Sequence, residues 1–329
     1  YPEDSAGSIM TTEYIDLKKD MTVDEAFDRI RKIGIDTETI YSCYVISNRR
    51  RLIGIVSLKD LLLNDKGCVI GDLMDENVIS ANTVDDKEEV AQTFDKYDIL
   101  ALPVVDKEGR LVGIITVDDV IDVIQEEATE DIEKMAAILP SEHSYFKTNV
   151  FNTFKARIPW LLLLMISATF TGSIISGFEG KIAIFPALVA FIPMLMDTGG
   201  NSGGQASVTI IRSISMGDIE FKDIFKVIWK EIRVAFLCAL TLAFVSALKL
   251  FLIDNLIFNN LDAGKAVVEI FVVCATLFCT VIVAKLIGCI LPILAKKIGF
   301  DPAVMASPLI TTIVDAVSLL IYFGIASAI

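Results

Sequence analysis

Residues 51–60 read Arg-Leu-Ile-Gly-Ile-Val-Ser-Leu-Lys-Asp, and residues 110–119 read Arg-Leu-Val-Gly-Ile-Ile-Thr-Val-Asp-Asp. The two stretches match at an offset of 59, so the first part of the chain is a tandem repeat. Upstream, Val23–Ala26 matches Lys87–Val90 at an offset of 64. The first copy therefore carries five more residues between its helix and its strands, and we expect this insertion to be loop.

Each copy is predicted to contain an amphipathic helix, a strand, a polar turn, a second strand and a helix, with the first strands at Ser42–Ile46 and Ala101–Val105. Where the second strand meets the helix, the pattern Gly-apolar-apolar-Ser/Thr-x-x-Asp places a hydroxyl and a carboxylate at the helix N-terminus. Such a pair can cap the helix or hold a ribose, and both interpretations stay open. The residues are Ser57, Asp60, Thr116 and Asp119.

The repeat resembles tandem CBS domains, which we place at residues 1–66 and 67–128. The resemblance implies one α/β unit, and CBS pairs often bind adenine nucleotides such as ATP between their copies. The four hydroxyl and carboxylate residues above match the nucleotide-contacting positions of that family.

The acidic excess of the chain lies entirely in its first half. Residues 1–157 hold 32 Asp and Glu against 18 Lys and Arg, whereas residues 158–329 hold 11 of each. The hydrophobic fraction of 53% and the mean hydropathy of +0.60 are too high for an average soluble protein. The sequence therefore predicts an acidic, water-facing module joined to a membrane module, and it excludes a basic nucleic-acid footprint.

A dense acidic segment begins at Asp119, near the end of the second copy, and leads into residues 129–157, predicted to be an acidic connecting helix and linker. Its carboxylates repeat with helical spacing, and oxygen ligands of this kind favour Mg²⁺ or Ca²⁺. The single histidine, His143, and six cysteines without a CxxC pair argue against a zinc or copper site. The alternative is an ordinary solvated helix face.

Residues 158–329 are predicted to form an all-α membrane domain of five transmembrane helices. Lys and Arg residues alternate between frequent and rare in successive connections, which predicts a cytoplasmic repeat and a C-terminus, Ile329, outside. The five apolar stretches are about 158–178, 182–196 continuing at 206–214, 234–253, 267–294 and 303–329.

Two places interrupt the apolar pattern. Residues 193–205, Pro-Met-Leu-Met-Asp-Thr-Gly-Gly-Asn-Ser-Gly-Gly-Gln, are predicted to break a helix beside protein or a wet cavity. Tight helix packing is the alternative, although it leaves the amides of Asn201 and Gln205 unexplained. The second interruption is Asp315, whose burial in lipid costs at least about 2.5 kcal/mol and usually marks an ion pathway. The alternative for Asp315 is a structural ion pair with Lys285.

The CBS pair, the acidic helix, the PMLMDTGGNSGGQ stretch and the final DPAVMASPLITTIVDAVSLLIYF stretch together resemble the MgtE family of magnesium channels. The resemblance implies a homodimer in the lipid bilayer with a central pore, in which Asp315 recognises hydrated Mg²⁺. Further pore residues are then expected at Ser307, Thr311, Thr312, Asn201 and Gln205. Regulatory Mg²⁺ is expected at Asp119, Asp122, Glu127, Glu130 and Asp131.

The expected function is Mg²⁺ influx through the plasma (inner) membrane, closed by cytosolic Mg²⁺. Two alternatives stay open: a membrane-anchored adenine-nucleotide sensor without transport, and a divalent-cation exchanger coupled to H⁺ or Na⁺. An enzyme is not expected, because the sequence shows no nucleophile–base pair, and Gly199–Gly204 lacks the lysine of a phosphate-binding loop. The chain starts at Tyr1 without Met, so we also expect it to be a fragment lacking the acidic helical domain that usually precedes this segment in the family.

Overall fold

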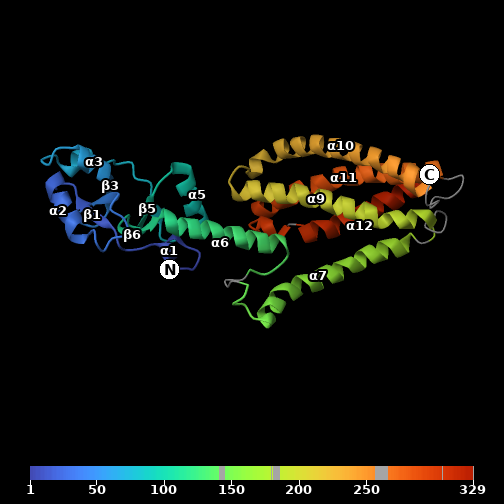
Figure 1. Ribbon diagram of the computed structural model, residues 1–329, viewed down its shortest axis with the longest axis horizontal. Coiled ribbons are helices and arrows are strands. Elements are labelled where there is room, and N and C mark those ends of the chain that lie inside the picture. The colour runs from blue at the N-terminus through green and yellow to red at the C-terminus, as the bar shows by residue number, and fades with distance from the viewer. Residues whose placement is uncertain (141–144, 179, 181–185, 256–265, 306, 329) are drawn as a thin grey trace. The chain divides into compact units, whose positions relative to one another are not determined.

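The computed structural model describes residues 1–140, 145–178, 180, 186–255, 266–305 and 307–328, so His143 and Ile329 lie outside the described residues. The chain forms two compact units, Tyr1–Ala128 and Thr129–Ile329 (Figure 1). The first unit contains all the named strands, and the second is helical.

The first unit contains two three-stranded sheets, one for each copy of the repeat. In each sheet the first strand pairs parallel with the second, and the second pairs antiparallel with the third. The strands are β1 (Ile15–Lys18), β2 (Ser42–Ile46), β3 (Leu52–Ser57), β4 (Ala81–Asn82), β5 (Ala101–Val105) and β6 (Leu111–Thr116). The strands predicted at 42–46 and 101–105 are confirmed as β2 and β5. The short edge strands β1 and β4 were not predicted.

Helices pack against both sheets of this unit. In the first copy, Thr22 and Glu25 form a capping box that fixes where α2 begins, as expected for a Thr three residues before a Glu. The helices are α1 (Ala6–Ile9), α2 (Val23–Ile33), α3 (Leu58–Leu63), α4 (Ile70–Leu73), α5 (Lys87–Tyr97) and α6 (Val117–Met135).

The short helix that opens each copy packs on the other copy. Ala6 of α1 lies in the core of the second copy, and Ile70 of α4 lies in the core of the first. A Cβ atom added at Gly113 would lie 2.8 Å from the sulfur of Met10. A Cβ atom added at Gly54 would lie 2.7 Å from the sulfur of Met74. The glycines of the repeated motif thus make room for a methionine from the start of the other copy, and this contact joins the two copies into one unit.

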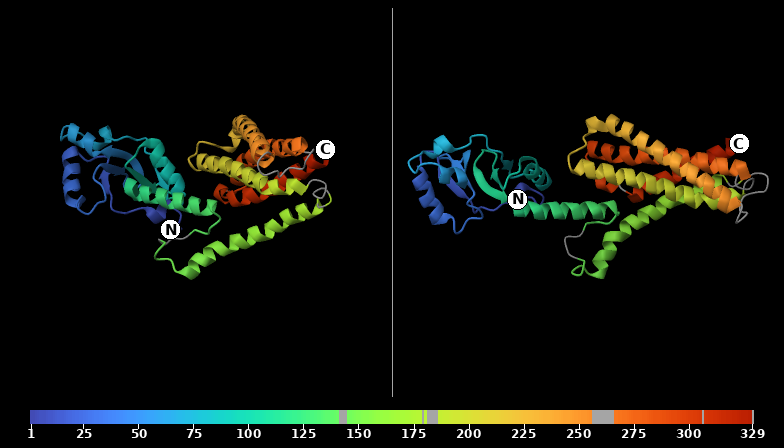
Figure 2. Two further views of the ribbon diagram at one scale, coloured as in Figure 1. Left: turned by 45° about the vertical axis from the view of Figure 1, so that its right-hand side comes forward. Right: turned by 45° about the horizontal axis from the view of Figure 1, so that its top comes forward.

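Within its described residues, the second unit contains five long helices: α7 (Val150–Gly177), α9 (Ile192–Ser215), α10 (Ile224–Lys249), α11 (Ala266–Lys297) and α12 (Ser307–Ala328). Both views of Figure 2 show α9, α10, α11 and α12 running alongside one another. Among the described residues, four helices are long and apolar enough to cross a membrane: Val150–Gly177, Phe221–Ile253, Ala266–Lys297 and Pro302–Ala328. The polar helix α9 is not one of the four.

Two apolar clusters show which helix ends meet. One cluster joins the end of α7, the start of α9, the end of α10, the start of α11 and the end of α12, through residues that include Ile175, Leu195, Leu250, Val272 and Tyr322. The other joins the end of α9 to the start of α10 and the end of α11, through residues that include Ile214, Val227 and Ile293. Helices α9, α10 and α11 therefore alternate in direction.

The prediction that residues 193–205 break a helix is wrong, because α9 is continuous from Ile192 to Ser215. Its glycines remain helical because they let neighbouring helices approach closely. A Cβ atom at Gly199 would lie 2.7 Å from Thr280, one at Gly200 would clash with Thr311, and one at Gly288 of α11 would clash with the carbonyl oxygen of Gly203. Residues 192–196 and 206–214 of the two predicted halves thus belong to one helix, while Pro186–Phe191 form a 3₁₀ helix and 182–185 lie outside the described residues.

We expect Gly288→Ala to lower the unfolding temperature of the purified protein in detergent, because the added methyl group has no space against the α9 backbone and overpacking costs about 1–3 kcal/mol. Gly172→Ala is the matched control, since a Cβ at this glycine of α7 meets nothing within 4 Å and Ala favours a helix. Equal unfolding temperatures for the two variants would contradict this account of the packing.

Candidate functional site

The face of α9 opposite its buried glycines carries a polar stripe. Asp197, Asn201 and Gln205 recur every fourth residue, and all three are exposed, whereas Ser202 and Gly203 are buried. The Asn201 amide donates a hydrogen bond of 3.0 Å to the Asp197 carboxylate. Side-chain oxygens at this spacing line one side of the helix, where they can interact with a hydrated cation or with water.

Helix α12, which packs against α9, brings Asp315 toward this stripe. The Asp315 side chain is half-buried, and its carboxylate is close enough to that of Asp197 for the two charges to interact. The hydroxyls of Thr311 and Thr312 donate to the Pro308 carbonyl at 3.1 and 3.0 Å, one turn back in α12, so their oxygens remain acceptors.

Two further expectations concern α12. Ser307 is its first residue, and its side chain lies outside the described part of the chain. No ion pair between Asp315 and Lys285 is found within the described residues, so the structure does not favour the structural-pair interpretation of Asp315. Asp197 of α9 and Asp315 of α12 thus remain two neighbouring acidic side chains at the contact of these helices.

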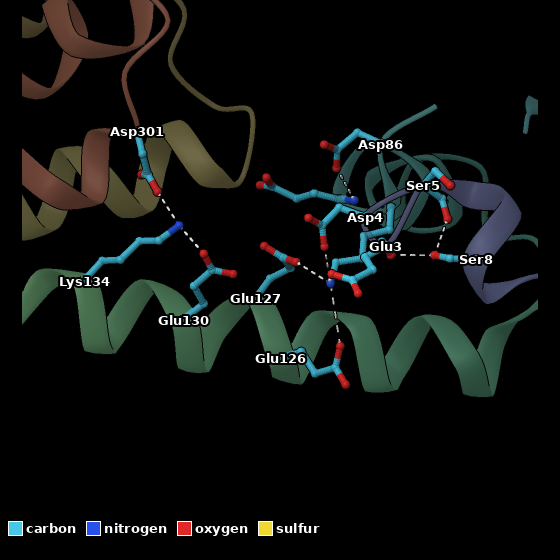
Figure 3. Close-up of polar contacts among 12 residues, drawn as sticks. Glu3, Asp4, Ser5, Ser8, Asp86, Glu126, Glu127, Glu130, Lys134 and Asp301 are labelled. Carbon is cyan, nitrogen blue, oxygen red and sulfur yellow. Dashed lines mark hydrogen bonds and ion pairs between the residues drawn. The ribbon is translucent and has the colours of Figure 1, made fainter. Parts of the chain in front are cut away.

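The acidic segment forms helix α6, in which several carboxylates are already neutralised by lysines (Figure 3). The Lys87 ammonium lies 3.2 Å from Glu127, 3.7 Å from Glu126 and 3.2 Å from Asp4. Burial lowers the pKa of Lys87, but hydrogen bonds to Asp4 and Glu127 outweigh it, so the net shift is upward. Lys87 is thus a charged node that joins the N-terminal segment, α5 and α6.

A second lysine, Lys134, forms ion pairs at the last turns of α6. The Lys134 ammonium forms ion pairs with Glu130 and, at 2.6 Å, with Asp301, which precedes α12 (Figure 3). Burial lowers the pKa of Lys134, yet the hydrogen bonds to Asp301 and Glu130 raise it well above its usual range. Lys134 therefore links the end of α6 to the segment that leads into α12.

Asp131 links the same turn of α6 to α9 by a hydrogen bond. Its carboxylate accepts a hydrogen bond of 3.1 Å from Ser215, the last residue of α9. Burial raises the pKa of Asp131; the Ser215 hydrogen bond opposes this, and the nearby Asp301 charge adds to it. Met135, Ile211 and Ala303 pack together beside this contact. The C-terminal turns of α6 thus contact the C-terminal end of α9 and the segment that leads into α12.

The other predicted metal residues, Asp119 and Asp122, lie further up α6. Asp122 is exposed, and Asp119 accepts a hydrogen bond of 2.8 Å from Thr116. Within the part of the chain that the structure describes, no group of three or more His, Cys, Asp or Glu side chains is arranged to hold a metal ion. A regulatory cation on α6 therefore needs further ligands from water or from another surface.

The predicted nucleotide residues pair with each other inside each copy. Ser57 caps α3: its hydroxyl accepts the N–H of Asp60 at 3.1 Å and donates to the Asp60 carboxylate at 2.5 Å. Thr116 and Asp119 repeat the hydroxyl-to-carboxylate bond in the second copy. The capping interpretation thus holds at Ser57, and a ribose has to exchange hydrogen bonds with these pairs in order to bind.

Comparison with known proteins assigns both units. The CBS domain profile matches residues 6–66 and 70–126, and the MgtE profile, described as a divalent cation transporter, matches residues 192–325. The magnesium transporter MgtE of Thermus thermophilus is 39% identical over 326 residues, covering 99% of this chain and 70% of that protein. The chain belongs to the MgtE family. The magnesium transporter MgtE of Bacillus subtilis is also 39% identical, over 100% of this chain and 70% of its own length.

Solved structures similar to this MgtE-family chain include the cytosolic domain of the Mg²⁺ channel MgtE in complex with ATP, at 47% identity, 37% of this chain, 50% of that chain and a TM-score of 0.37. The soluble part of a magnesium transporter is 45% identical over 39% of this chain and 50% of that chain, with a TM-score of 0.39. The family membership and the long apolar helices make this chain a multi-pass membrane protein with a tandem CBS pair.

Sequence reasoning missed several residues of these contacts, among them Asp197, Lys134 and Asp301. The spacing of Asp197, Asn201 and Gln205 was available as a signal, since residues four apart share a helix face. The pairing of Lys134 with Asp301 had no local signal, because the two residues are 167 positions apart.

Asp131→Asn is expected to raise the unfolding temperature by about 2 °C at pH 7 in a Mg²⁺-free buffer. The raised pKa of the folded-state carboxyl means that the folded chain loses stability relative to the unfolded chain as pH rises through about 3.9. The amide keeps an acceptor for Ser215 without this cost, so the gain should shrink toward pH 4. Asp122→Asn, at an exposed position of the same helix, is the control, and a gain that is equal at both pH values would count against burial as its cause.

Proposed function

We propose that this protein carries Mg²⁺ across the membrane along the polar stripe of α9 and past Asp315. The observation that carries the proposal is the placement of Asp197, Asn201 and Gln205 on an exposed face of a helix whose other face is packed into a transmembrane bundle. Polar side chains in such helices face protein or water rather than lipid. The relatives named as magnesium transporters support the choice of ion.

The chemistry of the stripe suits hydrated Mg²⁺. This ion demands near-octahedral oxygen coordination and gives up water reluctantly. Asp315, with the hydroxyl oxygens of Thr311 and Thr312 and the amide oxygens of α9, offers acceptors to the water shell, so the ion passes without being stripped. Few full charges keep it from binding too tightly, as conduction requires.

We propose five transmembrane helices, α7, α9, α10, α11 and α12, with α9 as the polar member. The alternating directions and shared ends of these helices support this topology. The end of the bundle that holds Ser215 and Lys134 also carries the basic residues Arg212, Lys226, Lys296 and Lys297, so it is the cytoplasmic side. The CBS pair is then cytoplasmic and the C-terminus is outside.

An exposed polar stripe within the bilayer needs a cover. A second copy of the chain, related by a two-fold axis, supplies an identical stripe and closes a pore lined by α9 and α12 of both protomers. The pore then carries two Asp315 carboxylates, one from each protomer. The homodimer is therefore part of the proposal, since it turns one half-lined surface into a closed path.

Gating is proposed to act through α6. Its C-terminal turns hold the cytoplasmic ends of α9 and α12 through Asp131 and Lys134, so any force on α6 reaches the pore helices. The exposed carboxylates of α6, such as Asp122, repel like charges, and cytosolic Mg²⁺ removes this repulsion and favours closure. Shifting the closed fraction from 1% to 99% needs about 5.5 kcal/mol of differential binding, which several weak sites supply together.

Asp315→Asn should reduce Mg²⁺ uptake into proteoliposomes to the level of empty liposomes, while the variant elutes as the same oligomer on size exclusion. The reason is that the amide keeps the size of Asp315 but removes the charge that recognises the ion. Asp218→Asn, in an exposed loop, is the control. Full uptake by Asp315→Asn would rule out this role.

The same preparation separates the other candidate functions. ATP binding in calorimetry without any Mg²⁺ uptake would favour a nucleotide sensor, and the pairs Ser57–Asp60 and Thr116–Asp119 would be its site. Uptake that requires a pH or Na⁺ gradient would favour a coupled exchanger.

Asp119→Asn combined with Asp122→Asn should raise the internal Mg²⁺ concentration needed for half-inhibition of uptake several-fold, because fewer carboxylates on α6 then gain from neutralisation. The uptake rate at low internal Mg²⁺ should stay unchanged, since these residues lie outside the pore. Inhibition curves that superimpose on those of the unmodified chain would contradict the gating proposal.

A further inference from the structure

Lys285 is a charged side chain placed deep in a transmembrane helix. It lies in α11, about 18 Å along the helix axis from Lys297 at about 1.5 Å per residue, and its side chain is almost fully buried, with 5% exposed. Keeping an ammonium group at such a depth is costly, so intramembrane lysines usually have a functional partner.

Within the described residues, Lys285 forms no ion pair and no hydrogen bond. Carboxylate and amide side chains lie nearby, in the same groove. Lys285 lines a groove of about 540 Å³ whose other walls are the polar stripe of α9 and residues 237, 238, 241 and 242 of α10. Asp197, Asn201 and Gln205 all line the same groove. The ammonium group therefore shares one space with the proposed ion path, although it lies beyond ion-pair distance of Asp197.

The charges around this groove offset one another. Asp197 lines the groove, and Asp315 of α12, which does not line it, is close enough to Asp197 for the two negative charges to interact. Lys285 contributes one positive charge to the same groove. The local charge is thus −1 in each protomer instead of −2, and a divalent ion is attracted less strongly than the two carboxylates alone would attract it.

We propose that Lys285 is a built-in counter-cation that limits how tightly the α9 groove holds a divalent cation. The inference rests on the proposed function, because it assigns a part of the same path. An ion must bind strongly enough to enter and weakly enough to leave. Lys285 meets the second condition, because its ammonium group repels a cation bound in the same groove and so speeds its release.

The first test is Mg²⁺ uptake into proteoliposomes as a function of external Mg²⁺. Lys285→Gln should lower the half-saturating concentration about tenfold and also lower the maximal rate, because removing a unit charge at this range strengthens binding by that order. Lys285→Arg keeps the charge and should stay within about twofold of the unmodified chain. Lys297→Gln, the same substitution at the end of the same helix, should change neither parameter.

The second test does not depend on transport. Mn²⁺ binding to the full chain in detergent is followed by electron paramagnetic resonance, with Mn²⁺ as the probe. Lys285→Gln should bind Mn²⁺ about tenfold more tightly, and this gain should be absent when Asp197→Asn is added, because the two charges act in one groove. Size exclusion and the unfolding temperature check that each variant folds.

The outcomes separate the two proposals. Absence of Mg²⁺ uptake by the unmodified chain overturns the proposed function, and the Mn²⁺ titration then decides on Lys285 by itself. Unchanged Mn²⁺ affinity in Lys285→Gln overturns the inference. Equal losses of the maximal uptake rate in Lys285→Gln and Lys285→Arg also overturn it. They would show that Lys285 acts through packing and that its charge has no part.

Discussion

The close approach of the α9 backbone to α11 and α12 is the contact on which the second unit depends. Gly199, Gly200 and Gly203 occupy one face of α9, where the side chains of Thr280, Thr311 and Ile310 leave no room for a Cβ atom. Because that face carries small residues, the α9 backbone packs directly against its neighbours. Such close packing drives helix association in a bilayer, where the hydrophobic effect does not. The opposite face is left free to carry Asp197, Asn201 and Gln205.

Charge compensation is the second constraint, and the same device recurs in both units. The first unit places Lys87 among Asp4, Glu126 and Glu127. The second unit places Lys134 between Glu130 and Asp301. An acidic helix is therefore held by a few internal lysines and keeps other carboxylates exposed. Lysines thus neutralise part of α6 within each unit, while carboxylates such as that of Asp122 stay exposed.

Much of the first unit followed from the sequence, because repeats and alternation are local signals. The matching motifs at 51–60 and 110–119 indicated two copies, and β2 and β5 have the predicted bounds. The edge strands β1 and β4 escaped prediction because they have only four and two residues. In the second unit, glycines at 199–204 suggested a break, since glycine weakens an isolated helix. Packing against α11 and α12 overrides that propensity, and only the three-dimensional structure reveals it.

The central claim is that the polar stripe of α9 faces a water-filled cation path. It is tested most directly by placing single cysteines at Asn201 and Gln205, in a background without native cysteines, and measuring their reaction with a charged methanethiosulfonate in proteoliposomes. Leu240→Cys, on an exposed apolar position of α10, controls for contact with lipid. We predict that the cysteines at 201 and 205 react, that Mg²⁺ slows them, and that the one at 240 does not react. Cysteines at 201 and 205 that are as unreactive as the one at 240, or whose reaction is indifferent to Mg²⁺, would contradict the claim.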